Sequence, residues 1–155
     1  MKINWKRLII CLAIPLAVGG LSALVSGGMA DYQQLNQPPL SPPGWVFPIV
    51  WTALYLLMGY ASYRVLTSEA PEDEKRRALV ACGAQLLVNF LWSPIFFGKE
   101  WRLTAFLVLV ILWILVYITM RLFSKIDERA GDLLLPYILW ITFAGYLNIG
   151  AFLLN

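Results

Sequence analysis

Residues 103–120 read LTAFLVLVILWILVYITM, an unbroken run of 18 residues without Asp, Glu, Lys or Arg. An α-helix rises 1.5 Å per residue, so this run is about 27 Å long, close to the roughly 30 Å hydrocarbon core of a bilayer. A run of this length without charge is typical of a transmembrane helix. The segment therefore predicts that the chain lies in a membrane.

Four further runs have the same properties, and the composition agrees with them. The chain has 155 residues, of which 60% are hydrophobic and 14% are charged, whereas an ordinary soluble domain has about 25% charged residues. We therefore predict an all-α membrane protein, with one domain over residues 1–155 that forms a bundle of five transmembrane helices. The predicted spans are residues 8–25, 46–63, 78–97, 103–120 and 133–154.

The first run also resembles a signal peptide, because Lys2, Lys6 and Arg7 precede it. Its apolar stretch is longer than the usual 7–15-residue signal core. It also contains the pair Gly19-Gly20 and Ser22, small residues that are typical of a helix packed against other helices. We therefore interpret it as a retained span.

The basic residues predict the orientation of the spans. Ten of the twelve Lys and Arg residues lie in the N-terminus and in the second and fourth loops, and two, Lys99 and Arg102, lie in the third loop. Basic residues accumulate on the cytoplasmic side of membrane proteins. The N-terminus is therefore predicted inside and the C-terminus outside, in an integral multi-pass protein that we expect in the cell membrane. Because the positive charge is a topology signal, we expect no nucleic-acid partner.

The residue types exclude several kinds of chemistry. The chain has no His, which removes a His-based triad and His-ligated zinc or haem iron. Cys11 and Cys82 both lie in apolar runs and are interpreted as small buried hydrophobic residues. No Asp, Glu, Lys or Arg lies within the predicted spans, so a carboxylate- or lysine-based acid/base pair has nothing from which to form. We expect no metal and no cofactor.

Aromatic and amide residues recur at helical spacing on three spans. An amide exposed to lipid is costly, so these faces should point into the bundle. The first outer loop, residues 27–44, contains Pro38-Pro39, Pro42-Pro43 and Tyr32, and we expect it to cover the outer mouth of the bundle as a lid. These helix faces predict one aromatic pocket beneath the lid. On the three spans in turn, the residues of the faces are Phe47, Trp51 and Tyr55; Gln85, Asn89, Trp92 and Ser93; and Tyr137, Trp140, Ala144 and Asn148.

Packing between helices is the alternative interpretation of the same residues. Trp51, Trp92 and Trp140 are also suited to interhelical contacts, and Gln85 and Asn89 to hydrogen bonds that join helices. Three further Trp residues at span ends are interpreted as interfacial anchors, and Trp113 as a packing or lipid-facing residue.

The motifs in these spans resemble the TspO/MBR family, the tryptophan-rich sensory or translocator proteins that include the peripheral benzodiazepine receptor. The resemblance covers nearly the whole chain. Its residues are Pro38-Pro39, SPPGWVFPIVWTALY at 41–55, Gln85-Leu86, Asn89, Trp92-Ser93, Pro136-Tyr137, Trp140, Phe143-Ala144 and Leu147-Asn148.

The resemblance implies a five-helix bundle, often a homodimer, that binds porphyrins such as protoporphyrin IX and benzodiazepine- or isoquinoline-type ligands. It ties Trp51 and Trp140 to ligand contact and to light-dependent porphyrin breakdown, in which they are the candidate catalytic residues. Tyr146 is followed by no Lys or Arg, so the sterol pattern of animal relatives is absent there. The full set of candidate ligand-binding residues is Tyr32, Phe47, Trp51, Tyr55, Asn89, Phe90, Trp92, Trp140, Ala144 and Asn148.

Three functions follow from these observations. The leading hypothesis is a receptor or sensor for tetrapyrroles, held by stacking and hydrogen bonds because no His is present. The second is photo-oxidative porphyrin degradation, for which the sequence has no conventional catalytic motif. The alternative is transport of a porphyrin or lipid, although the chain has no inverted repeat or broken-helix pair of the kind found in secondary transporters.

Overall fold

A computed structural model describes residues 2–26, 36–98 and 101–155. In these ranges the regular secondary structure is all helical, and five helical segments are long and apolar enough to cross a membrane. The predicted all-α, five-span membrane protein is therefore confirmed. The elements are α1 (Trp5–Val25), α3 (Val46–Leu66), α4 (Glu72–Ser93), the short π-helix η1 (Pro94–Gly98), α5 (Arg102–Ile126), α6 (Glu128–Leu133) and α7 (Leu135–Leu154).

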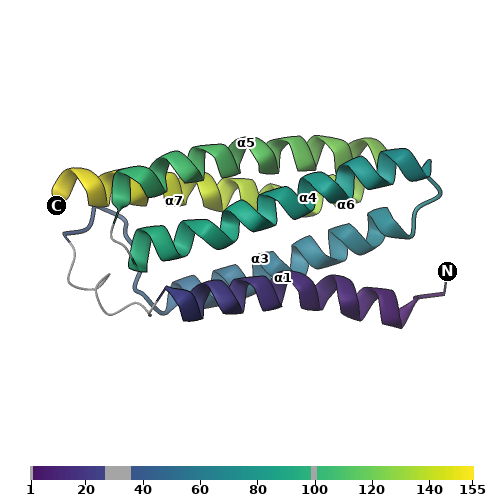
Figure 1. Cartoon of the computed structure of the whole chain (residues 1–155), viewed down its shortest axis with the longest axis horizontal. Helices are drawn as coiled ribbons and strands as arrows, with labels where there is room; N and C mark the ends of the chain where they lie inside the picture. Colours follow the sequence, from purple (N-terminus) through teal and green to yellow (C-terminus); the bar gives the residue numbers. More distant parts are fainter. Residues whose placement is uncertain (1, 27–35, 99–100) are drawn as a thin grey trace.

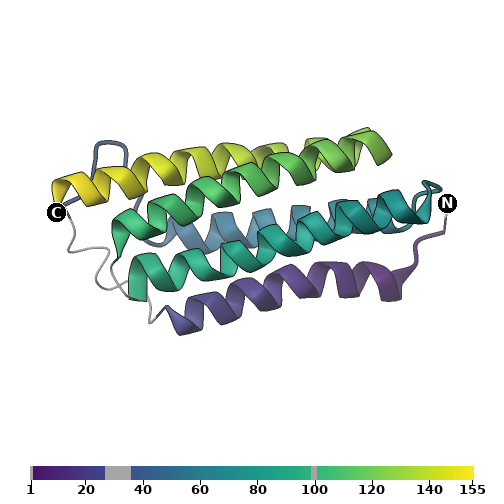
Figure 2. The same ribbon diagram turned by 45° about the horizontal axis from the view of Figure 1, so that its top comes forward.

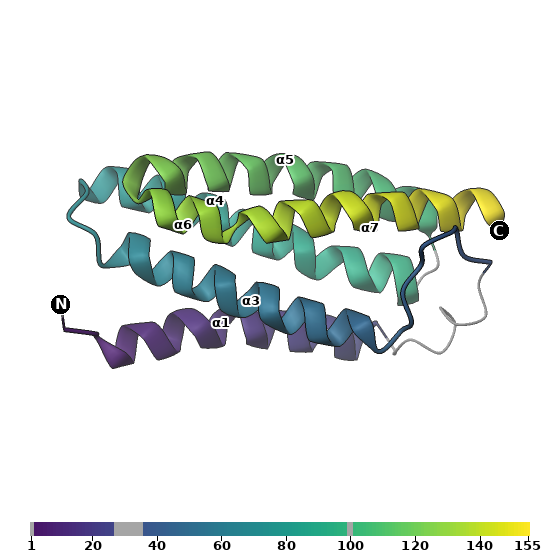
Figure 3. The ribbon, with the colours of Figure 1, turned by 180° about the vertical axis from the view of Figure 1, so that it is seen from behind.

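The long helices run side by side along the long axis of the molecule (Figure 1). Helix α1 packs on α3 and α4, α4 packs on α5, and α5 packs on α7. Figure 2 shows α7, α5, α4 and α1 in succession, and Figure 3 shows α3 between α1 and α7. Aromatic side chains join α7 to α3, with ring centroids of Phe47 and Trp140 5.8 Å apart. The bundle is therefore a closed ring in the order α1, α3, α7, α5, α4.

The two ends of the bundle differ in charge. The loop end carries residues 36–44 and the C-terminal Asn155, and the basic end carries the N-terminal segment, the α3–α4 connection and α6 (Figure 1). The basic-rich stretches of the sequence, including Arg64, Arg76 and Arg129, belong to the basic end. The chain termini lie at opposite ends, as an odd number of spans requires.

Several helices extend beyond the uncharged runs of the sequence. Helix α4 begins at Glu72 rather than at residue 78, because Glu72, Asp73 and Glu74 occupy its first turn, where acidic side chains interact favourably with the helix dipole. Before the last span, α6 ends at Leu133 and α7 begins at Leu135. Pro136 lies in the first turn of α7, where a missing N–H costs no hydrogen bond.

Helices α1 and α3 touch through their backbones. A Cβ atom built on Gly59 would lie 2.5 Å from the carbonyl oxygen of Cys11 and 2.8 Å from Cα of Leu12. A Cβ atom on Gly19 would lie 2.2 Å from the ring of Tyr55. Such close approach needs glycine, because any side chain would separate the helices. The two glycines thus fix the distance between α1 and α3.

The described part of the predicted lid is tied to the end of α7. Tyr146 donates a hydrogen bond to the carbonyl oxygen of Pro39 (2.6 Å), and the side chain of Asn155 donates to the carbonyl oxygen of Asn36 (3.0 Å). Pro38 is buried against Gly150, where a Cβ atom would lie 2.5 Å from the proline ring. Figure 3 shows this segment crossing from α7 to the start of α3. Residues 27–35 of the predicted lid, including Tyr32, lie outside the described residues.

Candidate functional site

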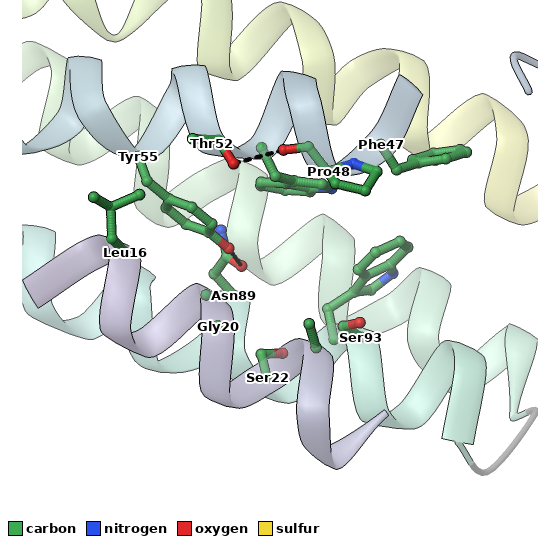
Figure 4. A pocket seen from close by; sticks show the side chains of 13 residues that line it. Leu16, Gly20, Ser22, Phe47, Pro48, Thr52, Tyr55, Asn89 and Ser93 are labelled. Atoms are coloured by element: carbon green, nitrogen blue, oxygen red, sulfur yellow. Dashed lines mark hydrogen bonds between the residues drawn. The ribbon is translucent and has the colours of Figure 1, made fainter. Parts of the chain in front are cut away.

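A cavity of about 260 Å³ lies between α1, α3 and α4 near the loop end (Figure 4). Five of the predicted ligand-binding residues line it: Phe47, Trp51 and Tyr55 from α3, and Asn89 and Trp92 from α4. The other lining residues are Pro48 and Thr52 from α3, Ser93 from α4, and Leu16, Gly19, Gly20, Ser22 and Ala23 from α1.

Trp51 is the centre of an aromatic cluster behind this cavity. Its ring stacks on Tyr55, with centroids 5.6 Å apart and an interplanar angle of 26°. It lies 6.5 Å from the ring of Trp92 and 6.2 Å from that of Tyr137. The ring of Trp140 stands at 90° to it, with centroids 6.4 Å apart. Offset and edge-to-face contacts of this kind are the favourable geometries for aromatic pairs, so the cluster is a well-packed wall.

A chain of neutral hydrogen bonds crosses the bundle beside Trp51. The Oη of Tyr55 donates to Oδ1 of Asn89 (3.0 Å), and Nδ2 of Asn89 donates to Oη of Tyr137 (2.6 Å). Tyr137 in turn donates to Oε1 of Gln85 (2.7 Å). Polar groups inside a membrane protein must be paired within the protein. This chain therefore holds α3, α4 and α7 together and fixes the amide of Asn89 at the cavity wall.

A substitution at Tyr137 tests how much these hydrogen bonds stabilise the fold, because Tyr137 does not line the cavity. Replacing Tyr137 with Phe leaves Nδ2 of Asn89 and Oε1 of Gln85 without their shared partner. Each unpaired buried polar group costs about 1–3 kcal/mol, so we expect the free energy of unfolding to fall by about 2–4 kcal/mol. Denaturant unfolding in detergent measures the change. The matched control is Tyr117→Phe on the exposed face of α5, and equal stability of the two variants would contradict this role.

Asn148 is paired with Trp92 rather than directed into the cavity. Its Oδ1 accepts from the indole N–H of Trp92 (3.0 Å), and its Nδ2 donates to the carbonyl oxygen of Arg102 (2.7 Å). The side chain is fully buried. Asn148 therefore orients the indole of Trp92, which forms part of the cavity wall.

Other candidate residues also lie away from the cavity surface. Trp140 packs against Phe47 and Trp51 from the α7 side, and Ala144 is buried on the same helix. Phe90 is half-buried, and its carbonyl oxygen accepts a hydrogen bond from Ser22 (2.8 Å). The cavity is therefore displaced from α7 towards α1.

Helix α1 supplies a wall that the candidate set did not include. The lining residues of α1 are small or aliphatic: Leu16, Gly19, Gly20, Ser22 and Ala23. From the sequence, Gly19, Gly20 and Ser22 are interpreted as packing residues. A Cβ atom on Gly20 would meet no heavy atom within 4 Å, unlike one on Gly19. Gly20 therefore lies at the edge of the cavity, whereas Gly19 is in close contact with Tyr55. The sequence alone does not distinguish these two glycines.

The chemical character of the site is neutral and aromatic. None of its lining residues is charged. Within the described ranges, no three His, Cys, Asp or Glu side chains come together as a metal site would require. Beside the site, the indole Nε1 of Trp140 is buried without a hydrogen-bond partner among the described residues. Such a surface stacks against flat apolar molecules and offers few directional contacts.

Comparison with known proteins gives a consistent result over most of the chain. The family model described as the TspO/MBR family matches residues 11–154. The tryptophan-rich sensory protein of Cereibacter sphaeroides is 39% identical over 155 residues, covering 100% of this chain and 95% of the relative. The tryptophan-rich protein TspO of Chlorobaculum tepidum is 37% identical, covering 96% and 95%. The translocator protein of Bos taurus is 33% identical, covering 78% and 72%.

Proposed function

The chain belongs to the TspO/MBR family, and from this premise we propose that it is a receptor for tetrapyrroles such as protoporphyrin IX. The same site is proposed for benzodiazepine- and isoquinoline-type ligands. The protein is an integral multi-pass membrane protein. We assign its basic end to the cytoplasm, following the distribution of Lys and Arg, and the cavity to the outer half of the cell membrane.

The observation that carries the proposal is the aromatic wall around Trp51. Trp51 lines the cavity beside Tyr55 and contacts the rings of Tyr55 and Trp140. A flat macrocycle gains most of its binding energy from stacking on such rings in a site without competing water. Because the chain has no His, the macrocycle is held without an axial ligand, so a metal-free porphyrin suits the site at least as well as haem.

The unpaired indole N–H of Trp140 supports the same proposal. An unpaired buried donor costs about 1–3 kcal/mol, which a ligand recovers by supplying an acceptor. The carboxylate of a porphyrin side chain and the carbonyl group of an amide drug both have this chemistry. Trp140 does not line the cavity itself, and its ring contacts Phe47 and Trp51, which do.

Titration with protoporphyrin IX in detergent, followed by quenching of Trp fluorescence, tests the proposal. We expect the double variant Trp51→Phe, Trp140→Phe to bind at least about tenfold more weakly, since two stacking contacts and one donor are lost. Trp113→Phe is the matched control, because its indole donates to Thr142 on a face away from the cavity (2.9 Å). Unchanged affinity in the double variant would exclude this site.

Light-dependent porphyrin breakdown is a second candidate function. It is favoured by the direct contact between Trp51 and Trp140, which puts two readily oxidised indoles together beside the cavity. The lining of the site has no charged acid or base, so the reaction would depend on light and on the indoles. Transport of a porphyrin or lipid remains the alternative function, and a homodimer remains the proposed assembly.

A further inference from the structure

The cavity opens on the side of the bundle. Gly20 and Ala23 of α1 and Pro48 and Thr52 of α3 line it and are all exposed. The residues on its inner wall, such as Asn89, are buried. Figure 4 shows the α1 residues and the α3 residues facing each other across the cavity, with α4 behind them. The mouth, defined by Gly20, Ala23, Pro48 and Thr52, therefore lies between α1 and α3.

The chemistry of this mouth fits lipid rather than water. Three of its four residues have no polar side chain, and the hydroxyl of Thr52 donates to the carbonyl oxygen of Pro48 (2.7 Å). The neighbouring Leu21 and Ile49 are exposed apolar residues. All six lie within uncharged spans. Since the mouth leaves no polar side chain unpaired, acyl chains can contact it without cost.

The α7 side of the loop end is closed. Pro38 packs on Gly150, and hydrogen bonds from Tyr146 and Asn155 hold the backbone of Pro39 and Asn36. Below them the space between α3 and α7 is filled by the rings of Phe47, Trp51 and Trp140. The described residues on this side therefore leave no opening that compares with the mouth.

The cavity is also small for the proposed ligand. Pockets for drug-sized ligands usually measure about 300–1,000 Å³, and this one measures about 260 Å³. Four linked pyrrole rings with their substituents exceed that volume, so a tetrapyrrole stacked on Trp51 must extend out of the cavity. Among the described lining residues, the exposed ones are the four of the mouth, so the mouth is the direction in which the macrocycle extends.

We propose that the ligand enters from the bilayer through the mouth between α1 and α3, and that part of the bound macrocycle stays in contact with acyl chains. This inference rests on the proposed function and narrows the ligand class to planar molecules that partition into membranes. The part of the macrocycle inside the cavity stacks on the aromatic wall, while the part that extends through the mouth replaces lipid at the surface of the bundle.

The test narrows the mouth and measures binding rates in phosphatidylcholine nanodiscs. Gly20→Leu adds a side chain at the mouth, where a Cβ atom meets nothing within 4 Å. Gly83→Leu is the matched control, because Gly83 is also an exposed helical glycine with nothing within 4 Å of its Cβ position. Ala23→Leu provides a second variant of the mouth. Quenching of Trp fluorescence after rapid mixing with protoporphyrin IX gives the association rate, and transfer to empty vesicles gives the dissociation rate.

We expect Gly20→Leu and Ala23→Leu to lower both rates by about tenfold, and Gly83→Leu to leave both within about twofold of the wild type. A narrowed route slows entry and exit together, whereas loss of space in the cavity raises only the dissociation rate. Unchanged association rates in both mouth variants would overturn the lateral route while the proposed function stands. An absence of quenching in the wild type would count against the proposed function itself.

Discussion

Replacing Gly59 with Val is expected to lower the free energy of unfolding by about 2–4 kcal/mol, because a buried side chain with no space forces its neighbours apart. The neighbours here are backbone atoms: the carbonyl oxygen of Cys11 and Cα of Leu12 lie 2.5 Å and 2.8 Å from the Cβ position. A backbone cannot change rotamer to relieve the overlap. Helix α1 must move away from α3, with loss of the contacts along their shared face. Denaturant unfolding in detergent measures the loss.

Gly20 and Gly83 supply the controls for this prediction. Both are helical glycines whose Cβ positions meet nothing within 4 Å, so Gly20→Val and Gly83→Val change helix propensity equally but create no overlap. We expect each to alter the free energy of unfolding by no more than about 0.5 kcal/mol. If Gly59→Val unfolds no more easily than these two variants, close contact between α1 and α3 does not stabilise the fold. The same displacement would also move Leu16, Gly19 and Gly20 of the cavity wall.

Loss of the indole at Trp51 is expected to slow light-dependent bleaching of bound protoporphyrin IX by at least about tenfold. An excited porphyrin can take an electron from an indole that touches it, and dioxygen in solution is the final oxidant. An indole gives up an electron more readily than the benzene ring of Phe. Trp51 and Trp92 both line the cavity, and Trp51 contacts both Trp92 and Trp140. The positive charge left on an oxidised Trp51 can therefore be shared with two neighbouring indoles.

The measurement follows the main absorption band of the porphyrin during illumination, at concentrations that saturate each variant. Rates are compared per bound porphyrin, because Trp51→Phe also weakens binding. Trp113→Phe is the control, since Trp113 stacks on Tyr117 on a different face of the bundle, and samples in the dark correct for spontaneous loss. Equal bleaching rates in Trp51→Phe and the control would exclude a catalytic role for this indole.

The helices follow closely from the sequence because length and lack of charge are the properties that a membrane selects. The span ends do not, because helices continue into the headgroup region, where charged side chains are stable. Helix α4 illustrates this: its first turn contains Glu72, Asp73 and Glu74, which a search for uncharged residues must exclude. The break at Leu134 is also hidden, since α6 ends and α7 begins within an otherwise continuous apolar run.

The site was predictable where polar and aromatic residues repeat along one helix face. Tyr55, Asn89 and Tyr137 were expected to face inward, and they form one hydrogen-bonded chain. Spacing along each helix does not say how the helices are rotated against each other. Spacing predicts Asn148 as a ligand-binding residue, and the structure adds that its amide binds Trp92 and a backbone carbonyl. The α1 wall was missed because open space beside Gly20 has no sequence signature.

The side chains that hydrogen-bond across the bundle are all neutral, which affects how the protein responds to the transmembrane voltage. A unit charge moved across a membrane couples to the transmembrane voltage by about 2.3 kcal/mol per 100 mV. Tyr55, Asn89, Tyr137 and Gln85 carry no formal charge, and neither does any other residue of the five uncharged runs. Rearrangement of the aromatic wall therefore moves no formal charge through the electric field. The bundle should therefore bind an uncharged ligand with the same affinity whether or not a transmembrane voltage is present. Any voltage dependence of binding then comes from the charge of the ligand.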